Sequence, residues 1–337
     1  MSGRATIVDV AQRAGVSKSL VSLVMRNSPS VSDEKRARVL KAARELAYRP
    51  NAMARSLVRQ RTYVIGVVIS DFGNPFFAEV AGGVEEAALA ADYRALFNSG
   101  DRDPGREAQA LDTLLQLRTD GIVLTGPTIE EQLVRKVATE TPVVVATRGS
   151  RSRFFDSVVS DDVAGARLAV EHLISLGHRR ITHLTGGDGA GAANRRTGYE
   201  TVMREMGLRP VVVQGDYTEQ TALDVAGTIL DGKTRPTAVF APNDFAAIGL
   251  LQALDDRGLR VPADVSIVGY DDTWLAGLAR IGLTTVHQDP RGIGSTAVAL
   301  LLERLDGDRT SARHVVRKPE LTIRSTTGKV REVRGRR

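Results

Sequence analysis

From residue 63 onward, short apolar runs alternate with segments of helical periodicity, and this alternation limits the possible folds more than any other feature of the chain. A continuously apolar run such as residues 63–69 is typical of a strand that is covered on both faces. Similar runs recur at residues 95–97, 121–124, 143–145, 181–184, 211–213, 238–240, 265–268 and 283–286. Helical spacing separates them at residues 77–89, 166–176 and 293–305. Repeated β-α-β units predict an α/β fold with parallel, doubly wound sheets, and nine or more strands are better divided between two sheets than forced into one.

Polar side chains follow many of these predicted strands. Ligands of open parallel sheets bind beyond the carboxyl ends of the strands, so two lobes are expected to place these ends around one cleft. A hydroxyl-rich ligand suits such groups, and Phe76 and Tyr217 offer rings that stack on the apolar face of a sugar or a base. Aspartates at strand ends are also common helix caps, which leaves a second interpretation open at each position. The polar segments are residues 71–77, 161, 243–244, 271–272 and 288–289.

The first twenty-five residues predict two short helices. Thr6 and Asp9 have the spacing of a capping box, in which each side chain bonds the backbone N–H of the other residue. Gly15 is expected to end the first helix, and Ser17 to cap a second that runs to about Met25. Two helices joined by so short a turn have the dimensions of a helix-turn-helix, although other helical hairpins share this pattern.

A third helix and a short fourth helix are predicted to complete the head. Residues 31–34 supply a cap and acidic residues for the third helix, and residues 48–51 end it because Pro50 disfavours helical backbone before it. Asn51 is expected to cap a brief basic helix over residues 52–58. That segment is either an interdomain linker or a minor-groove element with Leu57 as an apolar wedge. The buried face of the third helix is predicted to consist of Val39, Leu40, Ala43 and Leu46.

Charge is distributed unevenly along the chain. Residues 1–62 hold 13 Lys and Arg against 4 Asp and Glu, and residues 329–337 hold 5 against 1. The segment between them holds 28 basic against 35 acidic residues. A basic head on an acidic body points to a polyanion partner for the head, since phosphate neutralisation is the general source of nucleic-acid affinity. A solvated basic face without a partner is the alternative that charge alone leaves open.

Residues at fixed spacings extend through the head: Thr6, Ile7, Asp9, Val10, Ala11, Ala14, Gly15, Val16, Ser17, Val21, Ser22, Val31, Ser32, Tyr48, Pro50, Asn51, Ala54, Arg55 and Leu57. This pattern resembles the head of the lactose-repressor (LacI/GalR) family of bacterial transcriptional regulators. The resemblance implies that the second helix lies in the major groove of DNA, where Lys18, Ser19 and Leu23 read bases. It also implies that the hinge helices of two subunits enter the minor groove.

The resemblance extends the predicted DNA-binding set in both grooves. Two positions depart from the family pattern. Leu23 stands where a basic residue is frequent and offers only apolar contact, for example to a thymine methyl group. Arg26 stands where an asparagine is usual, so the operator sequence does not follow from relatives. The further major-groove residues are Thr6, Ser17, Ser22 and Arg26, and those of the minor groove are Asn51, Ala54, Arg55 and Leu57.

The body carries landmarks of the same family at residues 66–69, 74–77, 120–122, 171–178, 195–199, 243–249 and 268–272. The effector domain that it resembles is similar to periplasmic sugar-binding proteins. This implies two lobes whose chain crosses between them near residues 161, 288 and 321. Thr147 stands where several sugar-responsive members carry an aspartate. The residues that the resemblance places in the effector cleft are Phe76, Asp161, Arg195, Tyr217, Asn243, Asp271 and Gln288.

Other classes of function find little support in the sequence. Residues 187–192 match a dinucleotide fingerprint, but the acidic residue expected about twenty positions later is missing. The spacing of His172, His178 and His183 does not place two imidazoles on one helical face, and no serine stands in a nucleophile elbow. We therefore expect no enzyme, no metal and no cofactor.

The location of the protein is predicted from three absences in the sequence. The chain has no cysteine and no apolar run of eighteen residues, and its first ten residues lack the apolar core of a signal peptide. A cytoplasmic protein is therefore expected. The rival interpretation is a periplasmic sugar-binding protein, which would need a signal peptide and has no use for a basic helix-turn-helix.

These features predict a repressor that binds a near-palindromic operator as a homodimer, because each subunit reads one half-site. A carbohydrate bound between the lobes would control operator affinity through the hinge helix, which is too short to be stable unless it is paired on DNA. The predicted divisions are a head (1–50), a hinge and linker (51–62), a two-lobed effector and dimerisation domain (63–328) and a basic tail (329–337). The first lobe takes residues 63–161 and 289–320, and the second takes residues 162–288 and 321–328.

Overall fold

The computed structural model describes residues 5–25, 28–48, 61–232 and 234–330, which belong to two units separated at Thr62 and Tyr63. The first unit contains three helices, α1 (Ile7–Ala14), α2 (Lys18–Met25) and α3 (Asp33–Glu45). The predicted capping box is present, since the Asp9 carboxylate accepts from the Thr6 N–H at 2.7 Å and the Thr6 hydroxyl accepts from the Asp9 N–H. Gly15 ends α1 in the left-handed conformation, with φ of 62°.

The core of the first unit corrects part of the pattern expected for α3. Val10, Val21 and Val39 meet at its centre and are fully or almost fully buried. Leu40 is 41% exposed, so its predicted burial is wrong, and Ala42 takes the inward position instead. Helix α3 ends at Glu45, whereas Pro50 predicted that it would continue to about residue 48. At its start, the Ser32 side chain makes no capping hydrogen bond. Arg13 ties α1 to α3 through a 2.9 Å hydrogen bond to Glu45.

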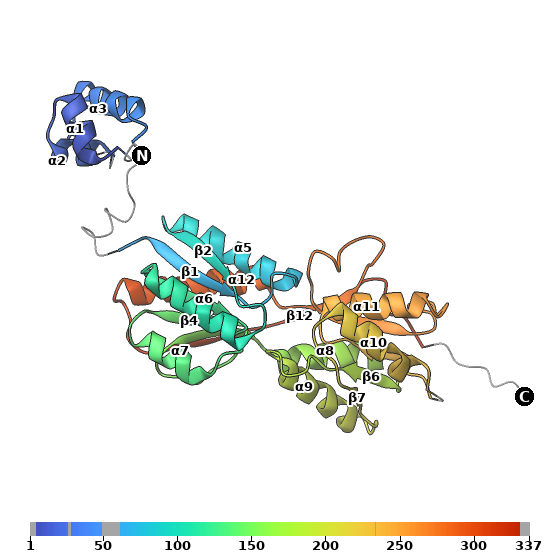
Figure 1. Cartoon of the computed structure of the whole chain (residues 1–337). Coiled ribbons are helices and arrows are strands. Elements are labelled where there is room, and N and C mark those ends of the chain that lie inside the picture. Colours follow the sequence, from blue (N-terminus) through green and yellow to red (C-terminus); the bar gives the residue numbers. More distant parts are fainter. Residues whose placement is uncertain (1–4, 26–27, 49–60, 233, 331–337) are drawn as a thin grey trace, which may run out of the picture. The chain divides into compact units, whose positions relative to one another are not determined.

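The second unit is built on two six-stranded sheets, which confirms the predicted fold class. All pairs in the first sheet are parallel, in the order β11-β5-β4-β3-β1-β2. Its helices cover both faces, α5 and α12 on one and α6 and α7 on the other (Figure 1). The elements are β1 (Val64–Ile69), α5 (Pro75–Ala90), β2 (Arg94–Ser99), α6 (Pro104–Gln116), β3 (Gly121–Thr125), α7 (Glu131–Ala138), β4 (Val143–Ala146), β5 (Asp156–Ser160), α12 (Pro290–Leu305) and β11 (His314–Arg317).

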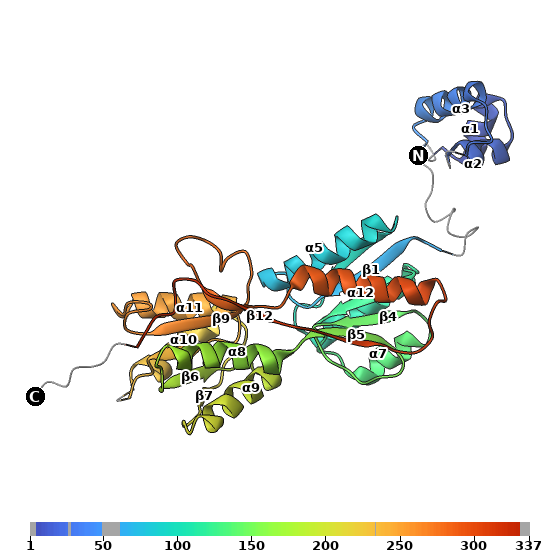
Figure 2. The same ribbon diagram turned by 180° about the vertical axis from the view of Figure 1, so that it is seen from behind.

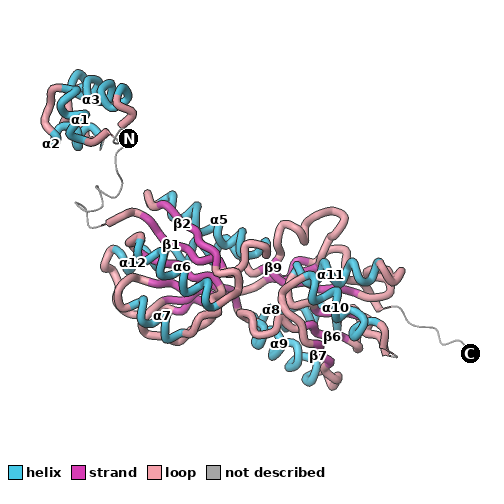
Figure 3. The backbone as a smooth tube through the Cα atoms, viewed as in Figure 1, coloured by secondary structure: helices cyan, strands magenta, loops and turns pink. Residues whose placement is uncertain are grey.

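The second sheet has the order β12-β10-β9-β8-β6-β7 and is parallel except for the β12 edge strand, which runs antiparallel to β10. Figure 3 shows strands of this sheet in magenta with the cyan helices of the same lobe around them. Helices α8 and α9 pack on one face, and α10 and α11 on the other. Its elements are α8 (Asp162–Ser175), β6 (Ile181–Leu184), α9 (Ala192–Glu205), β7 (Val211–Val213), α10 (Glu219–Leu230), β8 (Ala238–Phe240), α11 (Asp244–Asp255), β9 (Ser266–Asp271), β10 (Thr284–His287) and β12 (Glu320–Thr322). The described helices include none that is both long and apolar enough to span a membrane.

Three strands lack an apolar run, and the sequence pattern did not reveal them: β5, β11 and β12. Strand β11 alternates exposed and half-buried residues at the sheet edge, and β5 begins with Asp156, whose side chain is fully buried. Arg304 and Arg309 both bond the Asp156 carboxylate, with N–O distances of 2.8 Å. Burial opposes ionisation, but these bonds together hold the pKa of Asp156 below its usual value. The ion cluster thereby joins β5 to α12 and to the segment that leads into β11.

The chain passes between the two sheets three times. It leaves the first sheet after β5, returns after β10 and crosses again between β11 and β12. Figure 2 shows α5 and α12 lying against one another on the first lobe. Close approach of these helices depends on Gly83 and Gly294, since a Cβ atom at Gly83 would lie 2.1 Å from the Arg291 carbonyl oxygen.

Candidate functional site

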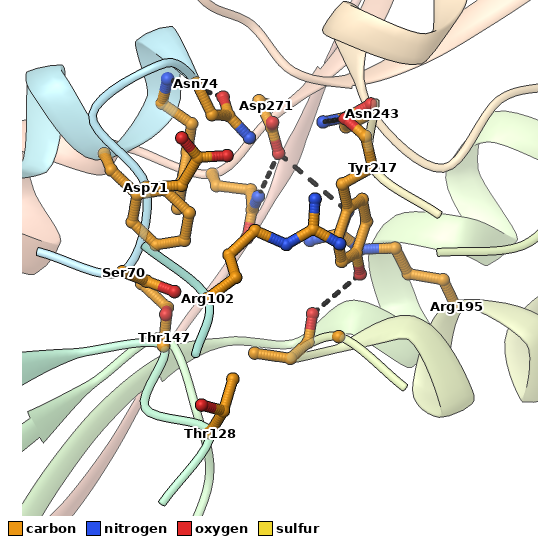
Figure 4. A pocket seen from close by; sticks show the side chains of 16 residues that line it. Ser70, Asp71, Asn74, Arg102, Thr128, Thr147, Arg195, Tyr217, Asn243 and Asp271 are labelled. Carbon is orange, nitrogen blue, oxygen red and sulfur yellow. Dashed lines mark hydrogen bonds and ion pairs between the residues drawn. The ribbon is translucent and has the colours of Figure 1, made fainter. Parts of the chain in front are cut away.

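A pocket of about 610 Å³, counting the part that opens to solvent, lies where loops that follow strands of the two sheets meet (Figure 4). Both lobes contribute to it, because the carboxyl ends of their strands face the same space. The lining residues are Ser70, Asp71, Asn74, Phe76, Phe77, Arg102, Gly126, Thr128, Thr147, Gly189, Ala190, Arg195, Tyr217, Asn243, Asp271 and Gln288.

The structure brings six of the seven predicted effector residues together in this pocket: Phe76, Arg195, Tyr217, Asn243, Asp271 and Gln288. The seventh, Asp161, is not among the lining residues. Its carboxylate accepts from the Ala164 N–H at 3.0 Å and caps α8, which is the alternative that the sequence left open for strand-end aspartates. Asn243 has both roles, since it lines the pocket and caps α11 through a 2.8 Å bond from the Ala246 N–H.

Several groups of the second lobe hold the side chain of Arg195 in place. Its Nε donates to Asp162 at 2.8 Å, its Nη1 donates to the Pro242 carbonyl at 2.5 Å, and Nη1 lies 3.9 Å from Asp271. The guanidinium also stacks on Tyr270, 3.7 Å from the ring centre. Burial opposes its charge, but the neighbouring Tyr217 and Asp162 outweigh this effect and raise the pKa of Arg195. The residue is therefore a fixed cation.

The ring of Tyr217 packs against the glycine-rich loop whose sequence matches a dinucleotide fingerprint. A Cβ atom at Gly186 or Gly189 would lie 2.4 or 2.3 Å from the Tyr217 ring. The Tyr217 hydroxyl donates to the Ala190 carbonyl at 2.7 Å. Gly186 and Gly189 therefore make room for an aromatic wall of the pocket.

Two carboxyls of this region are buried: Asp271, at the end of β9, lines the pocket, and Asp244, at the start of α11, is not part of the lining. Burial raises the pKa of Asp244 to about 7 and raises that of Asp271 as well, although Arg195 opposes the shift of Asp271. Asp271 accepts a 2.6 Å hydrogen bond from the Gln288 amide and has φ of 116°. A non-glycine residue in this region is strained by about 1–3 kcal/mol, and such strain concentrates at functional sites.

Asp244→Asn is expected to reduce the pH dependence of stability. A carboxyl whose pKa is raised on folding stabilises the protein below its unfolded pKa of about 4, and this contribution is lost as the pH rises to about 7. The asparagine can still accept from Thr273 through its oxygen and donate to the Thr285 hydroxyl through its amide. Thermal unfolding at pH 5 and pH 8 measures the effect. The melting temperature of the variant should fall less between these values than that of the wild type, and equal falls would refute the assignment.

Polar contacts cross the cleft around the pocket. Arg102, after β2, lies 3.7 Å from Asp216, which follows β7. Glu79 of α5 accepts from the Trp274 N–H at 2.9 Å, and Trp274 belongs to the loop after β9. Each contact joins one lobe to the other. A change in the distance between the lobes would therefore shift residues at the walls of the pocket, such as Arg102.

Several lining residues were missed by the sequence interpretation, notably Arg102, Gly126 and Thr128. All three follow strands of the first sheet, so applying the strand-end rule to β2 and β3 would have identified them. Thr147 was noticed only as a departure from the family. It has φ of 69°, which is unusual for a β-branched residue. Among the described residues, no group of three or more His, Asp or Glu side chains is arranged to hold a metal ion.

Five of the predicted major-groove residues lie on or directly before α2, namely Ser17, Lys18, Ser19, Ser22 and Leu23, whereas Thr6 precedes α1. Lys18 and Ser19 are exposed in the first turn of α2, and the Ser17 hydroxyl accepts from the Leu20 N–H at 3.2 Å. Leu23 is half-buried and packs against the core of the head, while Ser22 beside it is also half-buried. The Thr6 hydroxyl is engaged with Asp9. The remaining predicted DNA contacts lie outside the described residues: Arg26, Asn51, Ala54, Arg55 and Leu57.

Two family models match the chain. Residues 6–51 match the lacI family of bacterial regulatory proteins, and residues 170–327 match a periplasmic binding protein-like domain. The chain is 36% identical over 332 residues to the HTH-type transcriptional regulator DegA of Bacillus subtilis (strain 168), covering 96% of this chain and 98% of that protein. The chain therefore belongs to the lacI family of bacterial regulators, as its motifs predicted.

Solved structures agree with this family. The Lac repressor dimer bound to operator and the anti-inducer ONPF has a TM-score of 0.86 and 29% identity, covering 97% of this chain and 100% of that one. The complex of the transcriptional regulator CelR with cellobiose has a TM-score of 0.72 and 29% identity, covering 96% and 100%. The protein is accordingly a DNA-binding transcriptional regulator and not an enzyme.

Proposed function

We propose that this regulator is a repressor whose affinity for a near-palindromic operator is controlled by a small carbohydrate bound in the pocket between its lobes. The observation that carries the proposal is the convergence of six predicted effector residues on one pocket that both lobes line. A ligand that fills this pocket contacts loops of both lobes, so it changes the balance between their arrangements. A regulator that acts on bacterial operators works in the cytoplasm.

A carbohydrate is favoured by the chemistry of the walls. Phe76 and Phe77 form an edge-to-face pair on one lobe, with ring centres 5.4 Å apart, and Tyr217 lies on the other. Aromatic faces of this kind stack on the apolar face of a sugar ring, while Asn243, Asp271 and Gln288 supply polar groups for its hydroxyls. The cellobiose-bound relative supports this ligand class.

A homodimer is supported by apolar side chains that the described unit leaves exposed. Leu89 and Leu96, near the end of α5 and on β2, are exposed, as are Trp274 and Leu278 in the loop after β9. Large apolar side chains that remain exposed are candidates for a protein interface, and the operator-bound relative is a dimer. We propose that a second copy of the chain covers these side chains.

Selection of bound sequences from a random pool of DNA duplexes tests the proposal on the full chain. We expect enrichment of one near-palindromic sequence, because two identical heads read two half-sites. Lys18→Ala should weaken binding to that sequence by roughly 10- to 100-fold, since a base contact contributes about 1–3 kcal/mol. Lys41→Ala, an exposed lysine of α3, is the matched control and should change binding much less. A pool without enrichment would contradict the regulator's sequence specificity, and an enriched site without symmetry would contradict the dimer.

A further inference from the structure

Two arginines of α3 donate hydrogen bonds to backbone carbonyls on either side of helix α2. The Arg38 Nη2 donates to the Ala14 carbonyl at 2.7 Å, and the Arg36 Nη2 donates to the Ser28 carbonyl. Ala14 is the last residue of α1, before α2 begins, and Ser28 belongs to the segment that follows α2. The helix that carries the predicted base-reading residues is therefore held near both ends by charged side chains of one neighbouring helix.

The spacing of the two arginines along α3 explains how they reach opposite ends of α2. An α-helix turns by about 100° per residue, so side chains two residues apart leave it on nearly opposite sides. Val39, next to Arg38, is fully buried in the core of the head, where it packs with Val10 and Val21. This core fixes α3 against α1 and α2, and both guanidinium groups therefore start from a fixed base.

Arg38 completes the turn between α1 and α2. The last four carbonyls of a helix have no partner within it. The Gly15 N–H donates to the Gln12 carbonyl at 3.2 Å, and the Arg38 guanidinium takes the carbonyl of Ala14, where a cation also interacts favourably with the helix dipole. A Cβ atom at Gly15 would lie 3.2 Å from the Arg38 Nη2, so this glycine leaves room for the guanidinium. Arg38 thereby fixes the turn from which α2 starts.

Arg36 fixes the chain where it leaves α2. The Ser28 N–H donates to the Leu23 carbonyl at 3.0 Å, and the Ser28 carbonyl accepts from Arg36. The hydroxyl groups of Ser28 and Ser30 lie 2.8 Å apart, which ties the same turn together. Hydrogen bonds from a charged donor are about twice as strong as neutral ones. The backbone of Leu23, a predicted base-reading residue, is therefore linked to α3 through Ser28.

We infer that Arg36 and Arg38 are positioning residues, which set the orientation of α2 in the major groove and thereby the preference of the regulator for its operator over other DNA. The inference rests on the proposed function, because the orientation of α2 matters only if this helix reads bases. It also divides the basic charge of the head into two kinds. Lys18 is exposed on the reading helix itself, whereas the two arginines are directed to backbone carbonyls.

Specific and non-specific binding depend differently on the orientation of α2. Hydrogen bonds to base edges weaken steeply when donor and acceptor are misaligned. Attraction to phosphates comes from the release of counterions and requires no defined orientation of one helix. Loss of either arginine should therefore weaken binding to the operator much more than binding to DNA of random sequence.

Methionine variants of the full chain test this inference on the operator that is enriched from the random pool. Arg36→Met and Arg38→Met each remove the guanidinium and keep an unbranched side chain. Lys41→Met removes the same charge from an exposed position of α3 and is the matched control. The ratio of the affinities for the operator and for a random duplex should fall by roughly 3- to 10-fold in each arginine variant, as expected for one lost hydrogen bond. It should keep the wild-type value in Lys41→Met.

The salt dependence of binding distinguishes positioning from direct contact with phosphates. A lost phosphate contact reduces the slope of log K against log salt concentration by about 0.9. Arg36→Met and Arg38→Met should both keep the wild-type slope. An equal loss of affinity for both duplexes together with a reduced slope would overturn the inference, because the arginines would then bind DNA themselves.

Arg13→Ala separates positioning from a general loosening of the head. Arg13 of α1 also bonds α3, through Glu45 at 2.9 Å, but this bond joins two side chains and holds no carbonyl beside α2. Its loss should leave the affinity ratio unchanged. Arg38→Lys keeps a charged donor for the Ala14 carbonyl and should retain more of the ratio than Arg38→Met. The positioning role is refuted if Arg13→Ala lowers the ratio as much as Arg38→Met does, or if neither arginine of α3 affects it. Operator selection by the wild type tests the proposed function separately, so these outcomes leave that function standing.

Discussion

Replacement of Arg195 by alanine is expected to destabilise the second unit by about 3–5 kcal/mol and to abolish its response to the effector. The substitution leaves Asp162 and the Pro242 carbonyl without their donor, and it leaves Asp271 without a nearby cation in a buried site. Breaking a buried ion pair by removing one partner has a cost of this size because the remaining charge cannot be solvated. Tyr217 and Tyr270 also lose the cation beside their rings.

The neighbouring residue of α9 supplies a control for this experiment. Arg196 is exposed and pairs with Glu200 one helical turn later, so Arg196→Ala should change stability by less than about 1 kcal/mol. Chemical denaturation measures stability, and titration with a carbohydrate that binds the wild type measures the response. Arg195→Lys keeps the positive charge but lacks the planar guanidinium with its several N–H donors. This variant replaces Arg195→Ala in the experiment if the alanine variant does not fold. Equal stabilities of the Arg195→Ala and Arg196→Ala variants would contradict the structural role of Arg195.

The substitution Gly83→Ala should destabilise the first lobe by about 1–3 kcal/mol or more. A methyl group at this position would lie 2.1 Å from the Arg291 carbonyl oxygen and 2.8 Å from its Cα atom. Both atoms belong to the backbone of α12, so the helices themselves have to move apart. Helix α5 also carries Phe76 and Glu79, and the displacement should therefore weaken ligand binding as well.

The adjacent Gly82 provides a control that distinguishes the steric clash at Gly83 from the general effect of alanine on helix stability. A methyl group at Gly82 would meet only the Arg291 guanidinium, 3.3 Å away at the end of a flexible side chain. Gly82→Ala should consequently leave stability unchanged or raise it by up to about 1 kcal/mol, because alanine is the better helix former. Urea denaturation of both variants provides the comparison. A Gly83→Ala variant as stable as Gly82→Ala would show that α5 and α12 do not approach as closely as the structure indicates.

The strands with apolar runs and the helices of the head could be predicted from the sequence, because their signals lie within a few neighbouring residues. Apolar runs mark the central strands, and the Thr6–Asp9 capping box forms within one helical turn. Six pocket residues could be predicted because family motifs and strand ends mark them. The apolar pattern did not reveal β11, because this edge strand has solvent on one side. It also predicted that Leu40 is buried, because the spacing of apolar residues along α3 does not show which of them face the core.

Only the tertiary structure decided the partners of the polar groups. Arg195 meets Asp162 across 33 positions of sequence, and Asp156 meets Arg304 across 148. The Glu107 carboxylate accepts a hydrogen bond from the Thr128 N–H, and the local sequence around either residue does not predict this contact. The physical reason is that caps and periodic apolar faces are satisfied within a few residues, whereas a buried charge or hydroxyl requires a specific partner that the folded chain brings from elsewhere. The sequence by itself therefore determined the class of regulator and the position of its pocket, and the tertiary structure determined which groups of that pocket remain available to a ligand.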